Sequence, residues 1–252
     1  MSDQAHYWSE SAARYEEEFV DPFRRPDDNP LLDAIASIPD AATKTVADLG
    51  CGVGPLVPTL AAQFGRVIAV DFAAGMLDRA RERCAGLCNV EFLQRDLADL
   101  SPLAGKVDVA VAVNSLVQPS VAVIETVLRQ VRGILRPGGV FLGIVPAIDA
   151  VHYQTMLLVD RALDAGMPEP AARQNAAAHA EHHLYDFAFG DFRYIGLEQH
   201  FWQPFEIGYR LRRAGFRRVR KAKVRLDPSQ FACASDLKAY PAPWDWFFRA
   251  EV

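Results

Sequence analysis

A glycine cluster beside an aspartate is the feature of this sequence with the clearest chemical potential. The segment from Asp48 to Gly54 reads Asp-Leu-Gly-Cys-Gly-Val-Gly and follows a short apolar run. Glycines let the backbone turn sharply and approach a ligand closely. A helix that begins after such a loop offers unpaired N–H groups and a positive dipole end, which suit a carboxylate or a phosphate. The segment therefore predicts a loop that binds an anionic group of a ligand.

A second acidic residue, Asp71, ends the next apolar run of the chain. In nucleotide-binding α/β proteins, a carboxylate at about this place holds the ribose hydroxyls. A nicotinamide dinucleotide fits the glycine pattern poorly, because the third glycine of G-x-G-x-x-G would fall on Pro55. Asp48 also suits a ligand that carries an ammonium group better than it suits a pyrophosphate. The Tyr-x-x-x-Lys expected of such an oxidoreductase after the fourth strand is absent from the sequence.

Histidines in the second half of the chain are candidates for a general base, since an unperturbed imidazole titrates near neutral pH. We single out His182, His183 and His200 as catalytic candidates. His179 lies three and four residues before the first two, so a helix would place all three on one face. That spacing permits a metal site completed by Asp186 or His200, but a bare histidine cluster is weak evidence. We predict no metal.

Aromatic residues gather between positions 185 and 205, more densely than a core usually requires. They are expected to line an apolar acceptor site or to pack as the core of an insertion, and both readings remain open. The residues selected as substrate-binding candidates are Tyr185, Tyr194, Phe201 and Trp202. At the N-terminus, Tyr15 lies in an amphipathic segment expected to form a helix from Ser9 to Phe19.

The candidate site residues lie far apart in the sequence, so strands and helices must bring them together. Apolar runs predict strands, which alternate with segments of helical periodicity. Strands are expected at 45–49, 66–70, 90–94, 107–113, 140–145, 216–226 and 244–251, and helices at 31–38, 55–64, 74–85, 121–135, 152–165 and 205–213. The alternation predicts a doubly wound, mostly parallel α/β sheet, whose ligands bind beyond the carboxyl ends of the strands.

The chain is expected to divide into four parts. Residues 1–40 form N-terminal lid helices, and residues 41–148 form the Rossmann-like core that binds the cofactor. Residues 149–203 interrupt the alternation and form an α-rich cap with the acceptor site. Residues 204–252 complete the core sheet.

Four motifs in order resemble the class I S-adenosylmethionine-dependent methyltransferases. They lie at residues 46–54, 67–71, 94–97 and 135–139, and segments 216–226 and 244–251 resemble that family's closing antiparallel pair. The resemblance implies a seven-stranded sheet with an antiparallel closing strand, S-adenosylmethionine as cofactor, and methyl transfer to a small molecule.

The resemblance also implies residue roles. The methionine portion would lie along the glycine loop, with Asp48 supporting the loop or the ammonium. Asp71 would hold both ribose hydroxyls, Asp96 and Leu97 would frame the adenine edge, and Asn114 would face the sulfonium and the acceptor. The complete set of cofactor-binding candidates is Asp48, Gly50, Cys51, Gly52, Gly54, Asp71, Phe72, Met76, Asp96, Leu97, Asn114 and Tyr15.

Composition narrows the class of partner. The 252 residues carry a formal net charge of −5, which argues against nucleic acid, since phosphate backbones reward a basic face. No run reaches the roughly 20 apolar residues of a membrane span. Four cysteines without paired metal spacing favour a reduced, cytoplasmic protein. The main alternative to an enzyme is a non-catalytic protein that binds S-adenosylmethionine, because its cofactor motifs would look the same.

Overall fold

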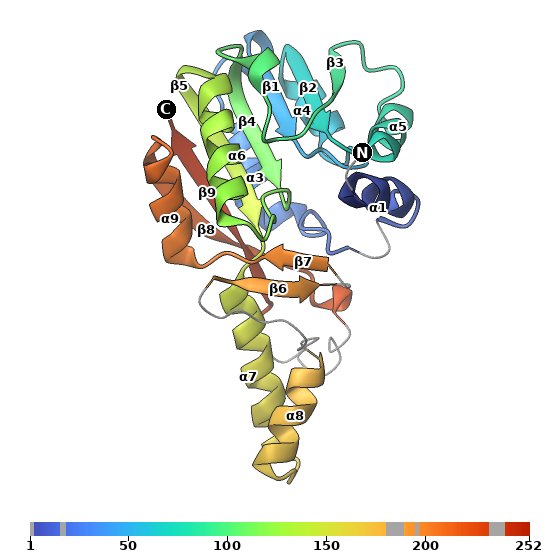
Figure 1. The fold of residues 1–252 in the computed structure, drawn as a ribbon, viewed down its shortest axis with the longest axis vertical. Coiled ribbons are helices and arrows are strands. Elements are labelled where there is room, and N and C mark those ends of the chain that lie inside the picture. Colours follow the sequence, from blue (N-terminus) through green and yellow to red (C-terminus); the bar gives the residue numbers. More distant parts are fainter. Residues whose placement is uncertain (1–2, 16–18, 180–188, 195–196, 232–239) are drawn as a thin grey trace.

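The structure is a computed structural model that describes residues 3–15, 19–179, 189–194, 197–231 and 240–252. Its centre is a seven-stranded sheet in the order β3-β2-β1-β4-β5-β9-β8 (Figure 1). The strands are β1 (Thr45–Leu49), β2 (Arg66–Asp71), β3 (Val90–Gln94), β4 (Val107–Val113), β5 (Leu135–Val145), β8 (Arg217–Arg225) and β9 (Trp244–Glu251). Strand β9 runs antiparallel to both of its neighbours, whereas β1 to β5 are parallel. The predicted fold class is confirmed.

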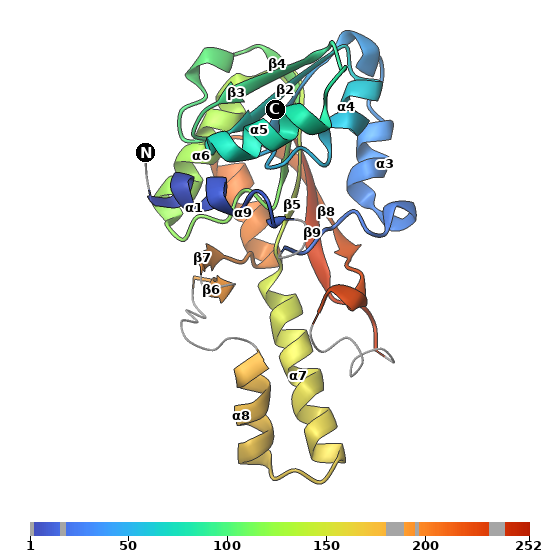
Figure 2. The ribbon, with the colours of Figure 1, turned by 90° about the vertical axis from the view of Figure 1, so that its right-hand side faces the viewer.

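Helices cover both faces of the sheet. Helices α3 (Pro30–Ala36), α4 (Val57–Gln63) and α5 (Ala74–Arg83) pack on one face, while α6 (Val121–Ile134) and α9 (Pro204–Arg213) pack on the other (Figure 2). Helix α6 buries Ile124, Val127, Leu128 and Val131, the spacing of one helical face. The central strands β1, β2 and β4 are apolar almost throughout, as strands buried on both faces must be, whereas the edge strand β8 is rich in Arg and Lys. None of the described helices combines the length and apolarity that crossing a bilayer requires.

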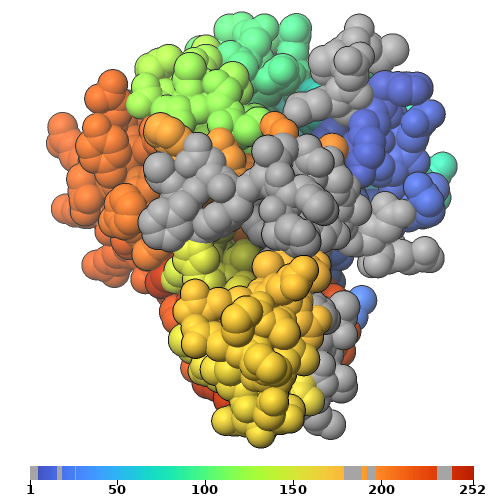
Figure 3. Space-filling model, turned by 60° about the horizontal axis from the view of Figure 1, so that its bottom comes forward, coloured from blue at the N-terminus to red at the C-terminus, as the bar shows by residue number. Residues whose placement is uncertain are grey.

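The predicted insertion forms a helical hairpin and a small β-hairpin. Helix α7 (Ile148–Asp164) follows β5 and packs along α8 (Glu169–His179), so that the pair projects from the body beyond the carboxyl end of β5 (Figures 1 and 2). Figure 3 turns this projecting end toward the viewer, with α8 in front. Strands β6 (Asp191–Tyr194) and β7 (Leu197–His200) form a separate two-stranded sheet.

Backbone hydrogen bonds tie the end of this insertion to the carboxyl edge of the main sheet. The N–H of His200 donates to the carbonyl of Val117 at 2.9 Å, and the N–H of Trp202 donates to that of Pro146 at 2.8 Å. The accepting residues, Val117 and Pro146, lie in the segments that follow β4 and β5. The cap thus lies against the edge where a sheet of this topology binds its ligands.

Two predicted elements begin well before their expected positions, and helix α8 and strands β6 and β7 were not predicted. Helix α1 (Asp3–Ser11) begins earlier than the predicted Ser9–Phe19 helix and ends in a turn closed by the N–H of Arg14 on the carbonyl of Ser11, 3.0 Å. The turn lets Trp8 and Phe19 meet, so tertiary packing overrides the simple periodicity. Strand β5 begins at Leu135 instead of position 140, because a register shift beside β4 accommodates the Pro-Gly-Gly turn.

Candidate active site

The glycine loop after β1 adopts a backbone that side chains other than glycine rarely take. Gly50, Gly52 and Gly54 have φ angles of 73°, 54° and 76°. A Cβ on Gly50 would lie 2.4 Å from Cβ of Ser115, so the loop passes directly against the end of β4. A Cβ on Gly52 would meet only Tyr15 Cζ, at 4.0 Å. The middle glycine therefore leaves room for a ligand beside the loop.

Asp71, the last residue of β2, holds this loop through its carboxylate. One oxygen accepts from the N–H of Gly52 and the other from the N–H of Ala73, both at 2.9 Å. Burial raises the pKa of Asp71, although these backbone N–H groups act in the opposite direction. Each carboxylate oxygen has a second acceptor position. Asp71 can therefore hold the loop and still accept from two ribose hydroxyls.

Asp48 lies on β1 beneath the loop and is 3% exposed. Burial, and then the neighbouring charge of Asp71, raise its pKa to about 7. A cationic ligand group would offset that repulsion, since an opposite charge favours the ionised carboxyl. The predicted role of Asp48 beside an ammonium group stays a prediction.

We therefore expect Asp48→Asn to stabilise the protein at pH 8 and to weaken its binding of S-adenosylhomocysteine. A carboxyl with a pKa near 7 when folded and 3.8 when unfolded loses stability as pH rises through that window. The gain in the free energy of unfolding is at most roughly 4 kcal/mol. Thermal unfolding at pH 4 and pH 8 checks it, because the advantage of the variant must vanish at the lower pH. The exposed Asp78→Asn serves as control, and equal curves for all three proteins would contradict the role.

The remaining cofactor candidates differ in how far their side chains are exposed. Asp96 is exposed, and its Oδ1 accepts from the N–H of Ala98 at 2.8 Å, while Leu97 is buried beneath it. Phe72 is half-buried. Cys51 is 5% exposed, and burial holds the pKa of its thiol well above the usual value, so it is an apolar packing group and not a nucleophile.

The N-terminal segment covers the loops after β1 and β2. Trp8 and Tyr15 pack on a buried cluster formed by Ala12, Val53, Ala73 and Met76. The rings of Tyr15 and Phe19 stack at 4.9 Å, and the Ser9 hydroxyl accepts from the N–H of Gly75 at 3.3 Å. The predicted role of this segment as a lid over the cofactor stays a prediction. Met76 is thereby part of the lid contact, and its contact with an adenine stays a prediction.

Asn114 and Gln118, in the segment after β4, and Asp245 on β9 are the next polar residues of the candidate site. Only Asn114 was predicted from the sequence. Asn114 has a φ of 48°, and its Nδ2 donates to Asp245 Oδ2 at 3.2 Å. Burial raises the pKa of Asp245 to about 7, against hydrogen bonds from Asn114 and the backbone of Ala147. Gln118 donates from Nε2 to the carbonyl of Ser115 at 3.1 Å. An aspartate in the apolar run Trp-Asp-Trp-Phe-Phe is the signal that could have identified Asp245.

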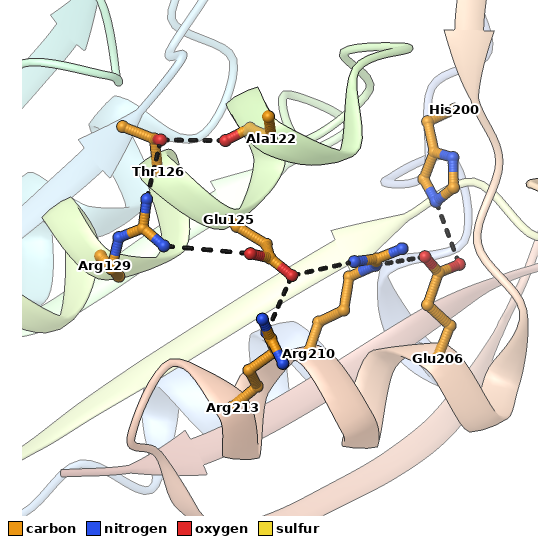
Figure 4. Close-up of polar contacts among 8 residues, drawn as sticks. All are labelled: Ala122, Glu125, Thr126, Arg129, His200, Glu206, Arg210 and Arg213. Atoms are coloured by element: carbon orange, nitrogen blue, oxygen red, sulfur yellow. Dashed lines mark hydrogen bonds and ion pairs between the residues drawn. The ribbon is translucent and has the colours of Figure 1, made fainter.

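His200 is completely buried, and both of its ring nitrogens have partners. Nδ1 lies 3.4 Å from Asp191 Oδ1, and Nε2 lies 3.0 Å from Glu206 Oε2. Figure 4 shows how this contact continues through Glu206 and Arg210 to Glu125 on α6. A general base must reach the acceptor, so this environment favours a structural role for His200. His182 and His183 lie outside the described residues, and their catalytic role stays a prediction.

Two of the four aromatic candidates for acceptor binding are packing residues, and the side chains of the other two lie outside the described part of the chain. Trp202 is 2% exposed and donates its indole N–H to the carbonyl of Leu116 at 2.7 Å, while Phe201 packs on Ile148. Both therefore anchor the cap to the core. Tyr185 lies outside the described residues, as does the side chain of Tyr194 on β6. In the described ranges, no three His, Cys, Asp or Glu side chains lie close enough together to hold a metal ion.

Comparison with known proteins agrees with this geometry. Residues 46–139 match the family described as Methyltransferase domain. The chain is 36% identical over 113 residues to Trans-aconitate 2-methyltransferase of Paracidovorax citrulli, which is 44% of this chain and 42% of that protein. It is 34% identical over 163 residues to the Methylobacterium nodulans protein of the same name, 63% of this chain and 58% of that one. The chain thus spans about half the length of these curated relatives.

A solved structure described as the DhpI-SAH complex superposes with a TM-score of 0.62 at 20% identity. The superposition covers 99% of this chain and 94% of the other, and it supports the fold. The glycine loop, Asp71 and the covering N-terminal segment also fit the cofactor of this family, S-adenosylmethionine. Over residues 46–139, the chain is thus similar to the methyltransferase-domain family, as its four sequence motifs predicted.

Proposed function

We propose that this protein transfers the methyl group of S-adenosylmethionine to a small-molecule acceptor. The observation that carries the proposal is the glycine loop, which Asp71 holds through Gly52 and Ala73 beneath the aromatic lid. The bound sulfonium would supply an activated methyl group with a neutral leaving group. Alignment of the acceptor then supplies most of the acceleration, which is the task of the lid and the cap.

The cap supports a small acceptor in preference to a macromolecule. Helices α7 and α8 project from the carboxyl edge of the sheet, and His200 and Trp202 are bonded to the segments after β4 and β5. The relatives named above are also called after a small-molecule acceptor. We therefore propose that the N-terminal segment covers the cofactor, that the core binds it and that the cap holds the acceptor.

A cofactor-consumption screen tests the proposal. Purified protein is incubated with S-adenosylmethionine and a panel of small hydroxyl, amino, thiol and carboxyl compounds, and S-adenosylhomocysteine is measured. At least one compound should raise its formation above the acceptor-free rate. Tight binding of S-adenosylhomocysteine without turnover of any compound would favour the non-catalytic alternative.

Once an acceptor is known, alanine variants of the histidine candidates distinguish a catalytic role from a structural one. If His182 or His183 is the general base, replacing it by alanine should slow turnover by about 10²-fold or more, with a rate that falls at low pH in the wild type. Affinity for S-adenosylhomocysteine should stay near normal, because the ribose contacts lie in the earlier loops. His200→Ala should instead lower the melting temperature. Full activity in both His182→Ala and His183→Ala would indicate an acceptor that is already a free nucleophile, such as a thiolate.

A further inference from the structure

Two buried amide oxygens at the end of β4 have no hydrogen-bond partner in the described part of the chain. They are Asn114 Oδ1 and Gln118 Oε1. Native proteins pair nearly all of their buried polar groups, because an unsatisfied one keeps the full cost of losing its bonds to water. Two such atoms within five residues, at the edge where this fold binds ligands, indicate that a ligand supplies the missing donors.

The partners of the two amide nitrogens fix which atoms are free. Gln118 Nε2 donates to the carbonyl of Ser115, and Asn114 Nδ2 donates to the carboxylate of Asp245. With Asp245 ionised, as it is at pH 8.5, turning either amide around would place two acceptor oxygens against each other. The atoms without partners are therefore oxygens, and only a group that carries N–H or O–H can satisfy them.

The surroundings separate these oxygens from the cofactor loop. Ser115 turns toward the loop, where its hydroxyl donates to the carbonyl of Leu49 at 2.6 Å. Asn114 turns instead toward Asp245 on β9, across β5. The chain between the two amides bonds to the end of the cap, since Val117 accepts from the N–H of His200. The sequence prediction places Asn114 among the cofactor residues and faces it toward both the sulfonium and the acceptor. Its pairing with Asp245 favours the acceptor side.

We propose that Asn114 Oδ1 and Gln118 Oε1 accept hydrogen bonds from the methyl acceptor, and that Asp245 is the positioning residue that holds the Asn114 oxygen toward it. The inference rests on the proposed function and narrows its substrate class to molecules with hydroxyl or amino groups. A fully ionised carboxylate offers no donor to these oxygens. The acceptor class of this protein therefore differs from the carboxylate after which its relatives are named.

Asp245→Asn tests the positioning role, because it should reverse the hydrogen-bonding character of the site. The carboxylate of Asp245 also accepts from the backbone N–H of Ala147. An asparagine there keeps that bond with its oxygen and points its NH₂ at Asn114. The Asn114 amide must then turn its own oxygen to residue 245 and present its NH₂ to the ligand. The double variant N114D/D245N restores both bonds and returns an acceptor oxygen to the site.

The experiment measures the binding of matched ring compounds by ligand-observed NMR at pH 8.5, with the protein saturated with S-adenosylhomocysteine. Catechol and aniline carry donors, whereas benzoate and trans-aconitate are ionised carboxylates. Wild type should bind a donor compound more tightly than either carboxylate. Asp245→Asn should weaken catechol binding at least tenfold and strengthen benzoate binding, and N114D/D245N should restore the wild-type order. Gln118→Met should weaken catechol without a gain for benzoate.

The outcomes separate this inference from the proposed function. Tighter binding of a carboxylate than of both donor compounds by the wild type would overturn donor recognition, as would the absence of any binding by catechol and aniline. An unchanged catechol-to-benzoate ratio in Asp245→Asn would overturn the positioning role. A protein that cannot be saturated with S-adenosylhomocysteine would instead contradict the proposed function itself.

Discussion

Replacing Glu206 by alanine is expected to lower the free energy of unfolding by about 3–5 kcal/mol, the usual cost of breaking a buried ion pair. Glu206 is 8% exposed and lies between His200 and Arg210, whose guanidinium donates to it. Arg210 also contacts Glu125 Oε1, at 3.5 Å. Without Glu206, the buried imidazole loses the partner of its Nε2 and the guanidinium is left only partly compensated. The expected fall in melting temperature is roughly 6–20 °C.

A matched surface pair provides the control for this prediction. Glu82 pairs with Arg79 at 3.2 Å on the exposed side of α5, where ion pairs contribute little. Glu82→Ala should therefore leave the melting temperature almost unchanged. A similar small change in Glu206→Ala would show that the network in Figure 4 does not stabilise the contact between the cap, α9 and α6.

The contribution of Glu206 to stability should depend on pH, because it depends on the charge of this carboxylate. Burial alone would raise the pKa of Glu206, but hydrogen bonds and charges from His200 and Arg210 outweigh burial and hold the pKa below its usual value. A lowered folded pKa contributes stability above pH 4.5, and that stability is lost as pH falls through the folded value. The difference in melting temperature between wild type and Glu206→Gln should accordingly shrink below about pH 4.

Replacing Asp71 by alanine is expected to reduce the affinity for S-adenosylhomocysteine at least roughly tenfold. Charge-assisted hydrogen bonds contribute about 1.5–3 kcal/mol, and two ribose hydroxyls would lose their charged acceptor. The N–H groups of Gly52 and Ala73 lose their acceptors as well, so the glycine loop is no longer held in place. Isothermal titration calorimetry measures the affinity, and circular dichroism establishes that the variant is folded.

Asp71→Asn is the matched variant, because its carboxamide keeps one acceptor oxygen and the shape of the side chain. We expect its affinity to lie between those of the wild type and Asp71→Ala. Normal affinity in a folded Asp71→Ala protein would mean that this carboxylate only shapes the loop after β1.

The sheet was predictable because its strands are apolar runs that end at glycine-rich or polar turns. Strands β1, β3, β4 and β9 have the predicted bounds, and β2 is longer by one residue. The places of Asp48 and Asp71 in the fold were predictable for the same reason, since both lie at or next to strand ends. Their positions in space follow from the topology alone.

Contacts between distant segments limited the rest of the prediction. Asn114 and Asp245 are 131 residues apart and meet only because β9 inserts beside β5. His200 has the residue type of a catalytic base, but its burial between Asp191 and Glu206 depends on how the cap and α9 pack. No local pattern encodes that environment.

Calorimetric titration of the purified protein with S-adenosylhomocysteine and, separately, with NAD tests the central claim most directly. Both ligands carry an adenosine, so the comparison isolates the part of the ligand that the glycine loop and Asp48 receive. A methyltransferase site predicts saturable binding of S-adenosylhomocysteine and none of NAD. Measurable binding of NAD, with none of S-adenosylhomocysteine, would contradict the account.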